Sequence, residues 1–143
     1  MKLINKFKAF NGSQEVYCHF SKQLNCEMNF AIYLPERAKN NKFPVLWYLS
    51  GLTCSHANVM EKGEYRKIAS ELEIIIVCPD TSPRGTGVPD EPENWQFGSG
   101  AGFYLDATEK PYSNNYKMYS YISQELQSVV LESFPIDASR QGI

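Results

Sequence analysis

The 143-residue sequence predicts an α/β fold, with a mostly parallel sheet and an antiparallel hairpin near its N-terminus. Two observations lead to this prediction. Residues 43–50 and 73–80 are almost continuously apolar, as strands covered on both faces are. Between them, apolar residues recur at helical spacing, so that a strand, a helix and a strand follow one another. The length suits one domain with a substantial buried core.

The first elements that the sequence predicts are two antiparallel strands, at residues 14–20 and 29–35. Both segments place β-branched and aromatic residues in near alternation, and the polar segment between them suits a hairpin connection. The continuously apolar strands at 43–50 and 73–80 follow. The helix between these two strands is indicated by Tyr65, Ile68, Ala69 and Leu72.

The clearest helix lies within residues 117–134, where apolar side chains mark one face at three- and four-residue steps. These side chains are Met118, Tyr121, Ile122, Leu126, Val129, Val130 and Phe134. Asn114 or Asn115 is expected to cap the start of the helix, and Pro135 to stop it.

The sequence Gln-Gly-Ile at 141–143 has the pattern of the first residues of another buried strand. We expect this strand to pair with residues 45–49 and to belong to a larger fold. If only three residues of it form, 45–49 is left as an apolar edge with unpaired backbone groups.

Residues 79–115 form a long segment, rich in glycine and proline, without a convincing regular element. Loops of this length in a compact domain are usually functional or disordered. Disorder is the weaker interpretation because the segment and its end carry many aromatic side chains. They are Trp95, Phe97, Phe103, Tyr104, Tyr112 and Tyr116. The sequence therefore favours an ordered excursion over a binding site.

Composition argues against several classes of partner and location. The net charge is only −2, and neither a basic stripe nor an acidic tail points to nucleic acid or a membrane. The N-terminus lacks the apolar region of a signal peptide, so a cytoplasmic protein is expected. The four cysteines are then expected to be reduced thiols, and their spacing does not suit a zinc site.

Cys54 and His56 raise the possibility of a thiol nucleophile with its base. Residues two apart in an irregular loop usually point away from each other, so a small thiol beside a pocket and a surface imidazole is the favoured interpretation. His19 alternates with strand residues and is expected to be structural or on the surface. A cysteine hydrolase that uses Cys54 remains a remote alternative.

Two other motifs carry less weight. The Gly-Ser-Gly-Ala-Gly segment at 98–102 lies within a loop and lacks the spacing of a dinucleotide fingerprint. Its glycines are expected to permit tight turns or a close approach to a ligand. The acidic residues Asp80, Asp90, Glu91 and Glu93 are expected to be solvated charges rather than acid–base catalysts.

The segment Ser-Gly-Leu-Thr-Cys at 50–54 follows a buried strand. In acyl-transfer enzymes, a loop that leaves a central strand often supplies a backbone N–H to the oxyanion hole. Gly51 lacks a side chain where the backbone would approach a substrate, and the N–H of Leu52 would serve as the donor. Such a loop follows the third strand of the α/β-hydrolase plan, whose nucleophile comes after the fifth.

Four motifs together resemble the S-formylglutathione hydrolase family, also called esterase D. They are YLSGLTC, PDTSPRG, FGSGAGFYLDAT and YKMYSY, in this order and with consistent spacing from about Val16 to Ile143. The resemblance implies an α/β-hydrolase fold, of which the chain carries the N-terminal half of a single domain, 1–143. It also implies cofactor-free hydrolysis of S-formylglutathione to glutathione and formate in formaldehyde detoxification. The family uses a Ser-Asp-His triad, and its serine elbow would begin just beyond Ile143.

Few site residues are transferred by the resemblance. Leu52 matches the position whose N–H forms half of the oxyanion hole, beside Gly51. Cys54 matches a thiol that makes such enzymes sensitive to thiol reagents without being the nucleophile. Trp95, Phe97 and Phe103 fall in the family's aromatic excursion near the substrate entrance.

The sequence departs from the family pattern before Asn58, where His56 and Ala57 replace acidic residues. Neither His19 nor His56 matches the catalytic histidine. The resemblance implies a glutathione thioester as substrate, no metal, general carboxylesterase activity and a possible homodimer. The competing interpretation is a catalytically inert fragment or binding module.

Overall fold

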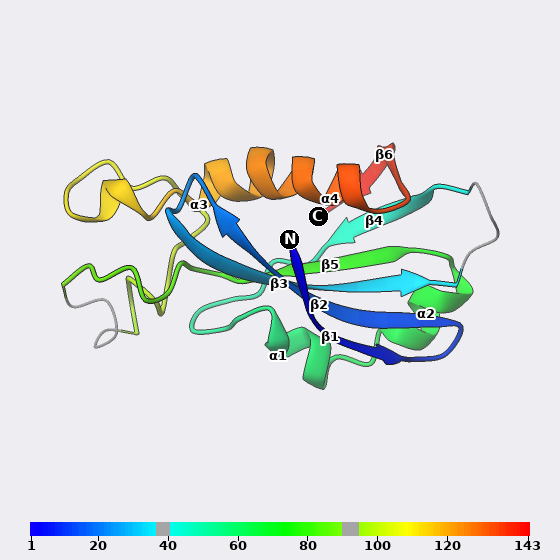
Figure 1. Ribbon diagram of the computed structural model, residues 1–143. Helices are drawn as coiled ribbons and strands as arrows, with labels where there is room; N and C mark the ends of the chain where they lie inside the picture. Colours follow the sequence, from blue (N-terminus) through cyan, green and yellow to red (C-terminus); the bar gives the residue numbers. More distant parts are fainter. Residues whose placement is uncertain (37–40, 90–94) are drawn as a thin grey trace.

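The computed structural model describes residues 1–36, 41–89 and 95–143. Its centre is one six-stranded sheet in the order β1-β2-β3-β5-β4-β6 (Figure 1). The strands are β1 (Lys2–Lys8), β2 (Gly12–Ser21), β3 (Cys26–Pro35), β4 (Phe43–Trp47), β5 (Ile75–Pro79) and β6 (Ile136–Gly142). The pairings from β1 to β5 are antiparallel, and β4 pairs in parallel with both β5 and β6. The predicted α/β class and N-terminal hairpin are confirmed, but the six-stranded sheet is mixed rather than mostly parallel, with three antiparallel and two parallel pairings.

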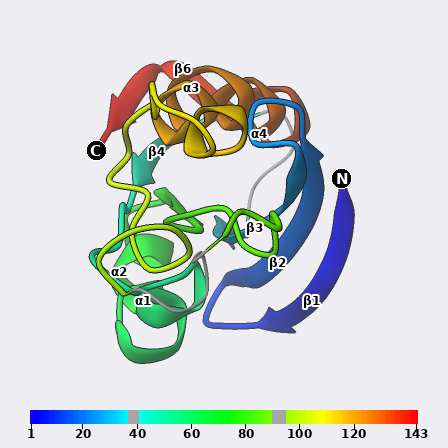
Figure 2. The same cartoon turned by 90° about the vertical axis from the view of Figure 1, so that its left-hand side faces the viewer.

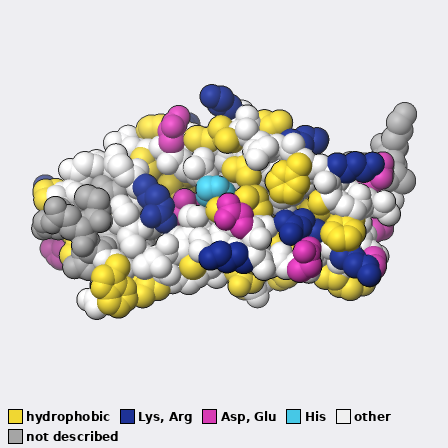
Figure 3. Space-filling model, turned by 90° about the horizontal axis from the view of Figure 1, so that it is seen from below, with side chains coloured by type: hydrophobic (Ala, Val, Ile, Leu, Met, Phe, Trp, Pro, Cys, Tyr) yellow, Lys and Arg dark blue, Asp and Glu magenta, His cyan; other side chains and the backbone are white. Residues whose placement is uncertain are grey.

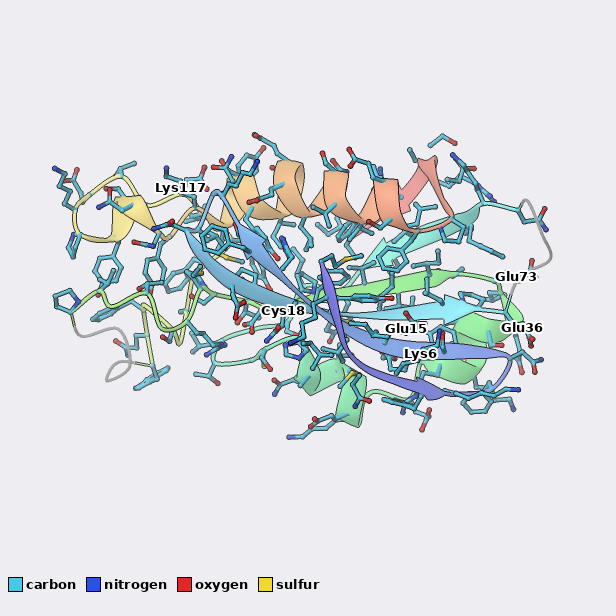
Figure 4. The ribbon with its side chains drawn as sticks, in the orientation of Figure 1. Lys6, Glu15, Cys18, Glu36, Glu73 and Lys117 are labelled. Carbon is cyan, nitrogen blue, oxygen red and sulfur yellow. The ribbon has the colours of Figure 1, made fainter. Side chains whose placement is uncertain are left out.

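The sequence did not predict β1, whose residues are all exposed. Its backbone pairs with β2, and an ion pair of 2.7 Å joins Lys6 Nζ to Glu15 Oε1 on the neighbouring strand (Figure 4). Burial raises the pKa of Glu15, but hydrogen bonds from Lys6, Tyr17 and Ser13 outweigh it and leave this pKa below its usual range. The strand is therefore held by pairing and charge rather than by a buried apolar face.

The expectation for the last strand was partly wrong. β6 pairs with β4, as predicted, but it begins at Ile136 instead of residue 141. Most of its residues after Ile136 are polar and exposed, so they lack the apolar pattern of a buried strand. Because β6 pairs with Phe43, Val45 and Leu46 of β4, the edge strand on this side of the sheet is β6. Residues 45–49 are not the edge that the sequence predicted.

Helices pack on both faces of the sheet (Figure 1). On one face, α1 (Ala57–Lys62) and α2 (Arg66–Glu71) bury Met60 and Ala69 against β2, β3 and β5. The predicted helix around residues 65–72 is thus confirmed as α2, whereas α1 was not predicted. Among the described residues, no helix is long and apolar enough to cross a membrane.

The other face is covered by one long helical rod. It comprises α3 (Met118–Ser120), a π-helical segment η2 (Tyr121–Leu126) and α4 (Gln127–Ser133). The apolar side chains predicted for this helix, apart from Val129, pack into the larger core, together with residues of β3, β4 and β5. Pro135 follows its end, as expected, but neither Asn114 nor Asn115 caps its start, which Lys117 precedes (Figure 4).

The start of the rod is capped from a distant loop. The Asp106 carboxylate accepts hydrogen bonds from the Ser120 N–H at 3.0 Å and from the Ser120 hydroxyl at 2.5 Å. A cap of this kind satisfies a first-turn donor that has no partner within the helix. Pattern alone pointed to the asparagines because the capping residue is remote in the chain.

The described parts of residues 79–115 contain little regular structure, which agrees with the prediction. They form a short 3-10 turn, η1 (Tyr112–Asn114), and the isolated bridges Gly98↔Ala101 and Asp106↔Lys117. Figure 2 views the molecule from the end at which these loops gather. On the face shown in Figure 3, basic and acidic side chains are interspersed.

Candidate active site

Two loops that follow parallel neighbouring strands meet at one edge of the sheet. β4 ends at Trp47 and leads into residues 48–56, and β5 ends at Pro79 and leads into residues 80–84. Ligands of open α/β sheets bind beyond the carboxyl ends of such strands. The predicted oxyanion loop therefore lies at the edge where this class of fold places its sites.

The segment Gly51–Cys54 forms a tight turn in which the Cys54 N–H donates to the Gly51 carbonyl at 3.2 Å. Thr53, the third residue of the turn, has a φ of 61°, a left-handed conformation that is unusual for a β-branched residue. The Tyr104 hydroxyl donates to the Ser50 carbonyl at 2.7 Å, and the Thr53 N–H donates to the Gly100 carbonyl at 2.8 Å. The turn is therefore held on both sides.

The Leu52 N–H makes no hydrogen bond to any residue in the described ranges. Leu52 lines a cavity of about 270 Å³ together with Gly51, Ala101, Phe103 and other residues of the same loops. A side chain at Gly51 would meet no described atom within 4 Å, so the space beside it is open. An unpaired backbone donor at such a cavity is what an oxyanion hole requires. The assignment of Leu52 and Gly51 to this role remains a prediction.

Cys54 and His56 do not form a catalytic pair. No hydrogen bond joins the Cys54 thiol to the His56 imidazole, although both residues are described. Instead, His56 Nδ1 lies 3.6 Å from Oδ2 of Asp80. His56 is also mostly buried, with 17% of its side chain exposed, which corrects the expectation of a surface imidazole.

Asp80 is buried, with 5% exposure, and the expectation that it is a solvated charge is wrong. Burial raises the pKa of Asp80, but the neighbouring His56 imidazole and the hydrogen bonds from Arg84 outweigh it and lower this pKa below the usual range. The Thr81 N–H donates to Asp80 Oδ1 at 2.8 Å. The position of Asp80 directly after a buried strand was the only signal in the sequence for its part in this site. Asp90, Glu91 and Glu93 lie outside the described residues.

The Gly-Ser-Gly-Ala-Gly segment at 98–102 turns tightly, as its composition predicted. Gly98 has a φ of 62°. A Cβ at Gly100 would lie 2.5 Å from the carbonyl oxygen of Trp95, and one at Gly102 would lie 2.9 Å from that of Thr81. The Ser82 hydroxyl donates to the Gly98 carbonyl at 2.6 Å. These glycines allow the segment to pack against the loop that follows β5.

The three aromatic residues predicted near the substrate differ in position. Phe103 lines both the cavity beside Leu52 and a second cavity of about 310 Å³, which Phe97 also lines. Phe97 packs edge-on against Tyr112, with ring centroids 5.9 Å apart. Trp95 is largely exposed and lines neither of these two cavities. Their contact with a substrate remains a prediction.

His19 has a structural role, which is one of the two alternatives that the sequence left open. It is buried, its Nε2 lies 2.9 Å from the Tyr121 hydroxyl, and the two rings stack. Burial lowers the pKa of His19. The imidazole joins β2 to the long helical rod and lines neither cavity at the candidate site.

The chain is similar to several known proteins. Curated S-formylglutathione hydrolases from Bos taurus and Mus musculus are each 46% identical to the whole chain, which covers 51% of their length. A solved S-formylglutathione hydrolase from Agrobacterium tumefaciens is 59% identical, with a TM-score of 0.94 over 99% of this chain and 51% of that one. The chain thus spans about half the length of these relatives.

A solved ferulic acid esterase is 20% identical, with a TM-score of 0.69 over 92% of this chain and 47% of that one, and this likeness concerns the fold alone. Together with the Agrobacterium structure it confirms the α/β-hydrolase-like fold expected from the sequence. The family model described as "Putative esterase" matches residues 21–143. The chain therefore belongs to the esterase family.

Proposed function

We propose that this chain forms part of a cofactor-free serine thioesterase that hydrolyses S-formylglutathione to glutathione and formate. The proposal includes a broader activity on carboxylic esters, because both substrates pass through the same kind of tetrahedral intermediate. Its site in this chain consists of Leu52 and Gly51 at the oxyanion, with Cys54, Trp95, Phe97 and Phe103 around the substrate.

The observation that carries the proposal is the Leu52 N–H in the loop after β4, which makes no hydrogen bond to the described residues, in a chain whose whole length is 46% identical to curated S-formylglutathione hydrolases. The 143 residues contain no Gly-x-Ser-x-Gly segment, so the elbow serine of the mechanism is not among them. The aspartate and histidine partners of this serine are likewise proposed to come from another part of the protein.

In the proposed reaction, the serine hydroxyl attacks the thioester carbonyl while the histidine takes its proton. Negative charge then develops on the carbonyl oxygen. The Leu52 N–H and the N–H of the residue after the serine stabilise this charge in the transition state. Glutathione leaves as the thiol, and water releases formate from the acyl-enzyme. We further propose a cytoplasmic location and a homodimer.

The test is an assay of the full-length protein with S-formylglutathione, following loss of the thioester and release of formate. Turnover that disappears after treatment with a serine-directed fluorophosphonate is expected. Hydrolysis of p-nitrophenyl acetate but not of the thioester would show that the substrate is wrong. Activity that survives the fluorophosphonate and is lost in Cys54→Ser would show instead that the reaction class is wrong and that the enzyme is a cysteine hydrolase.

A further inference from the structure

Arg84 contacts all three loops at the candidate site. Its Nη2 donates to the Cys54 carbonyl at 2.9 Å, and its Nη1 donates to the Ser99 carbonyl at 2.9 Å. Its Nε and Nη2 also bind the Asp80 carboxylate, at distances from 3.1 to 3.4 Å. One side chain therefore connects the turn after β4, the loop after β5 and the glycine-rich segment.

The guanidinium group is occupied by protein acceptors. Each of its three nitrogens has a partner, and the partner carboxylate of Asp80 is buried and also faces His56. A planar fork of donors suits this arrangement because it reaches a carboxylate and two carbonyls at fixed angles. A lysine at this position would keep the charge but could not make the same set of contacts. Arg84 is therefore built to hold the loops rather than to bind a substrate anion.

The turn that Arg84 contacts requires external support. Its geometry, with a hydrogen bond from the Cys54 N–H to the Gly51 carbonyl and a positive φ at Thr53, is close to a type II turn. Glycine or asparagine is favoured at the Thr53 position, and a β-branched residue is strained there. Such strain persists only where the surroundings impose the conformation. The bonds from Arg84 and Thr81 to the Cys54 carbonyl, at the end of the turn, supply part of that constraint.

We propose that Arg84 is a positioning residue that holds the strained Gly51–Cys54 turn, and with it the Leu52 N–H, in the geometry that binds the developing oxyanion. This inference rests on the proposed function for its effect on turnover. Its effect on the turn itself does not depend on that function.

The test uses the full-length protein and the variant Arg84→Met, with Arg66→Met as the matched control. Arg66 also donates to a carbonyl, that of Met60 at 2.8 Å, and pairs with a carboxylate, that of Glu64 at 3.4 Å, but it lies at the start of α2. Because misplacing a catalytic group by about 1 Å costs roughly 10²-fold, Arg84→Met should lower kcat about 10- to 100-fold. KM should stay within a factor of about 3, since the lost interaction acts in the transition state. Arg66→Met should leave both constants nearly unchanged.

A second-site variant separates positioning from general structural support. Thr53→Gly removes the strain at the positive φ, because glycine adopts this conformation readily. In the Arg84→Met background it should restore part of the lost kcat. If Arg84→Met does not fold, as judged by its thermal melt, Arg84→Lys provides the same comparison.

Hydrogen–deuterium exchange of the peptide that covers residues 51–56 gives a readout independent of turnover. Faster exchange is expected in Arg84→Met but not in Arg66→Met, with protection partly regained in the double variant. Loss of activity without recovery by Thr53→Gly, a rise in KM alone, or unchanged exchange would each overturn the proposal. A wild-type protein without esterase activity would contradict the proposed function instead, and the exchange data would still decide whether Arg84 holds the turn.

Discussion

Replacing Leu52 by proline should abolish most turnover of the full-length enzyme without unfolding it. Proline removes the backbone N–H that is proposed to bind the oxyanion, and the loss of one such donor costs about 10²- to 10³-fold in kcat. The fold loses little, because this N–H has no hydrogen bond to the described residues. Leu52 is the second residue of a turn close to type II, where proline is favoured. A Cβ at Gly51, the residue before it, would meet no described atom within 4 Å.

The free energy of unfolding should therefore change by less than about 1 kcal/mol, the usual effect of a proline that fits its backbone. Leu52→Ala is the matched control, since it shortens the same exposed side chain but retains the N–H. Steady-state kinetics with S-formylglutathione and a thermal melt measure both effects. If Leu52→Pro is stable and keeps a kcat close to that of Leu52→Ala, the Leu52 N–H does not bind the oxyanion.

Three further predictions concern the thiol, the buried acid and the isolated chain. Alkylation of Cys54 should inhibit the full-length enzyme by crowding the site, whereas Cys54→Ser should keep most activity and lose that sensitivity; near-complete loss would make the thiol the nucleophile. Asp80, whose pKa is lowered on folding, should contribute stability that is lost as the pH falls below about 4. Asp80→Asn should therefore flatten the acid side of a curve of stability against pH. An unchanged curve would contradict the ion pairs of Asp80. The 143-residue chain expressed alone should show no esterase activity above background and should self-associate on size-exclusion chromatography, because apolar side chains such as Leu46 and Ile143 are exposed; a monodisperse monomer with a sharp melt would oppose the second expectation.

The strands that the sequence predicted are those whose side chains decide their position. β5 is wholly buried and β3 and β4 bury most of their residues, and burial leaves a direct apolar signal in the chain. β1 and most of β6 are exposed, and backbone pairing with a neighbour determines them instead. Such pairing leaves no periodic pattern of apolar residues in the sequence, so β1 was missed and β6 was misplaced.

The candidate site was predicted in the same uneven way. Gly51 and Leu52 follow a recognisable strand, so their place at the carboxyl edge could be inferred from local order. The burial of Asp80 could not, because its partners His56 and Arg84 reach it only through the folded loops. An acidic residue is expected to be solvated as long as the cation that neutralises it is not known.

The position of β5 in the sheet has a consequence for the folding pathway. β5 is the strand that joins the antiparallel part, ending at β3, to the parallel part, beginning at β4. The hairpin of β2 and β3 can form from neighbouring residues, whereas Tyr33↔Ile76 and Trp47↔Val77 close long loops. Closing these loops costs entropy before the new contacts stabilise the chain, so these pairings form slowly. Docking of β5 is therefore the step at which the two parts of the sheet become one, and substitutions within it should slow refolding more than they speed unfolding.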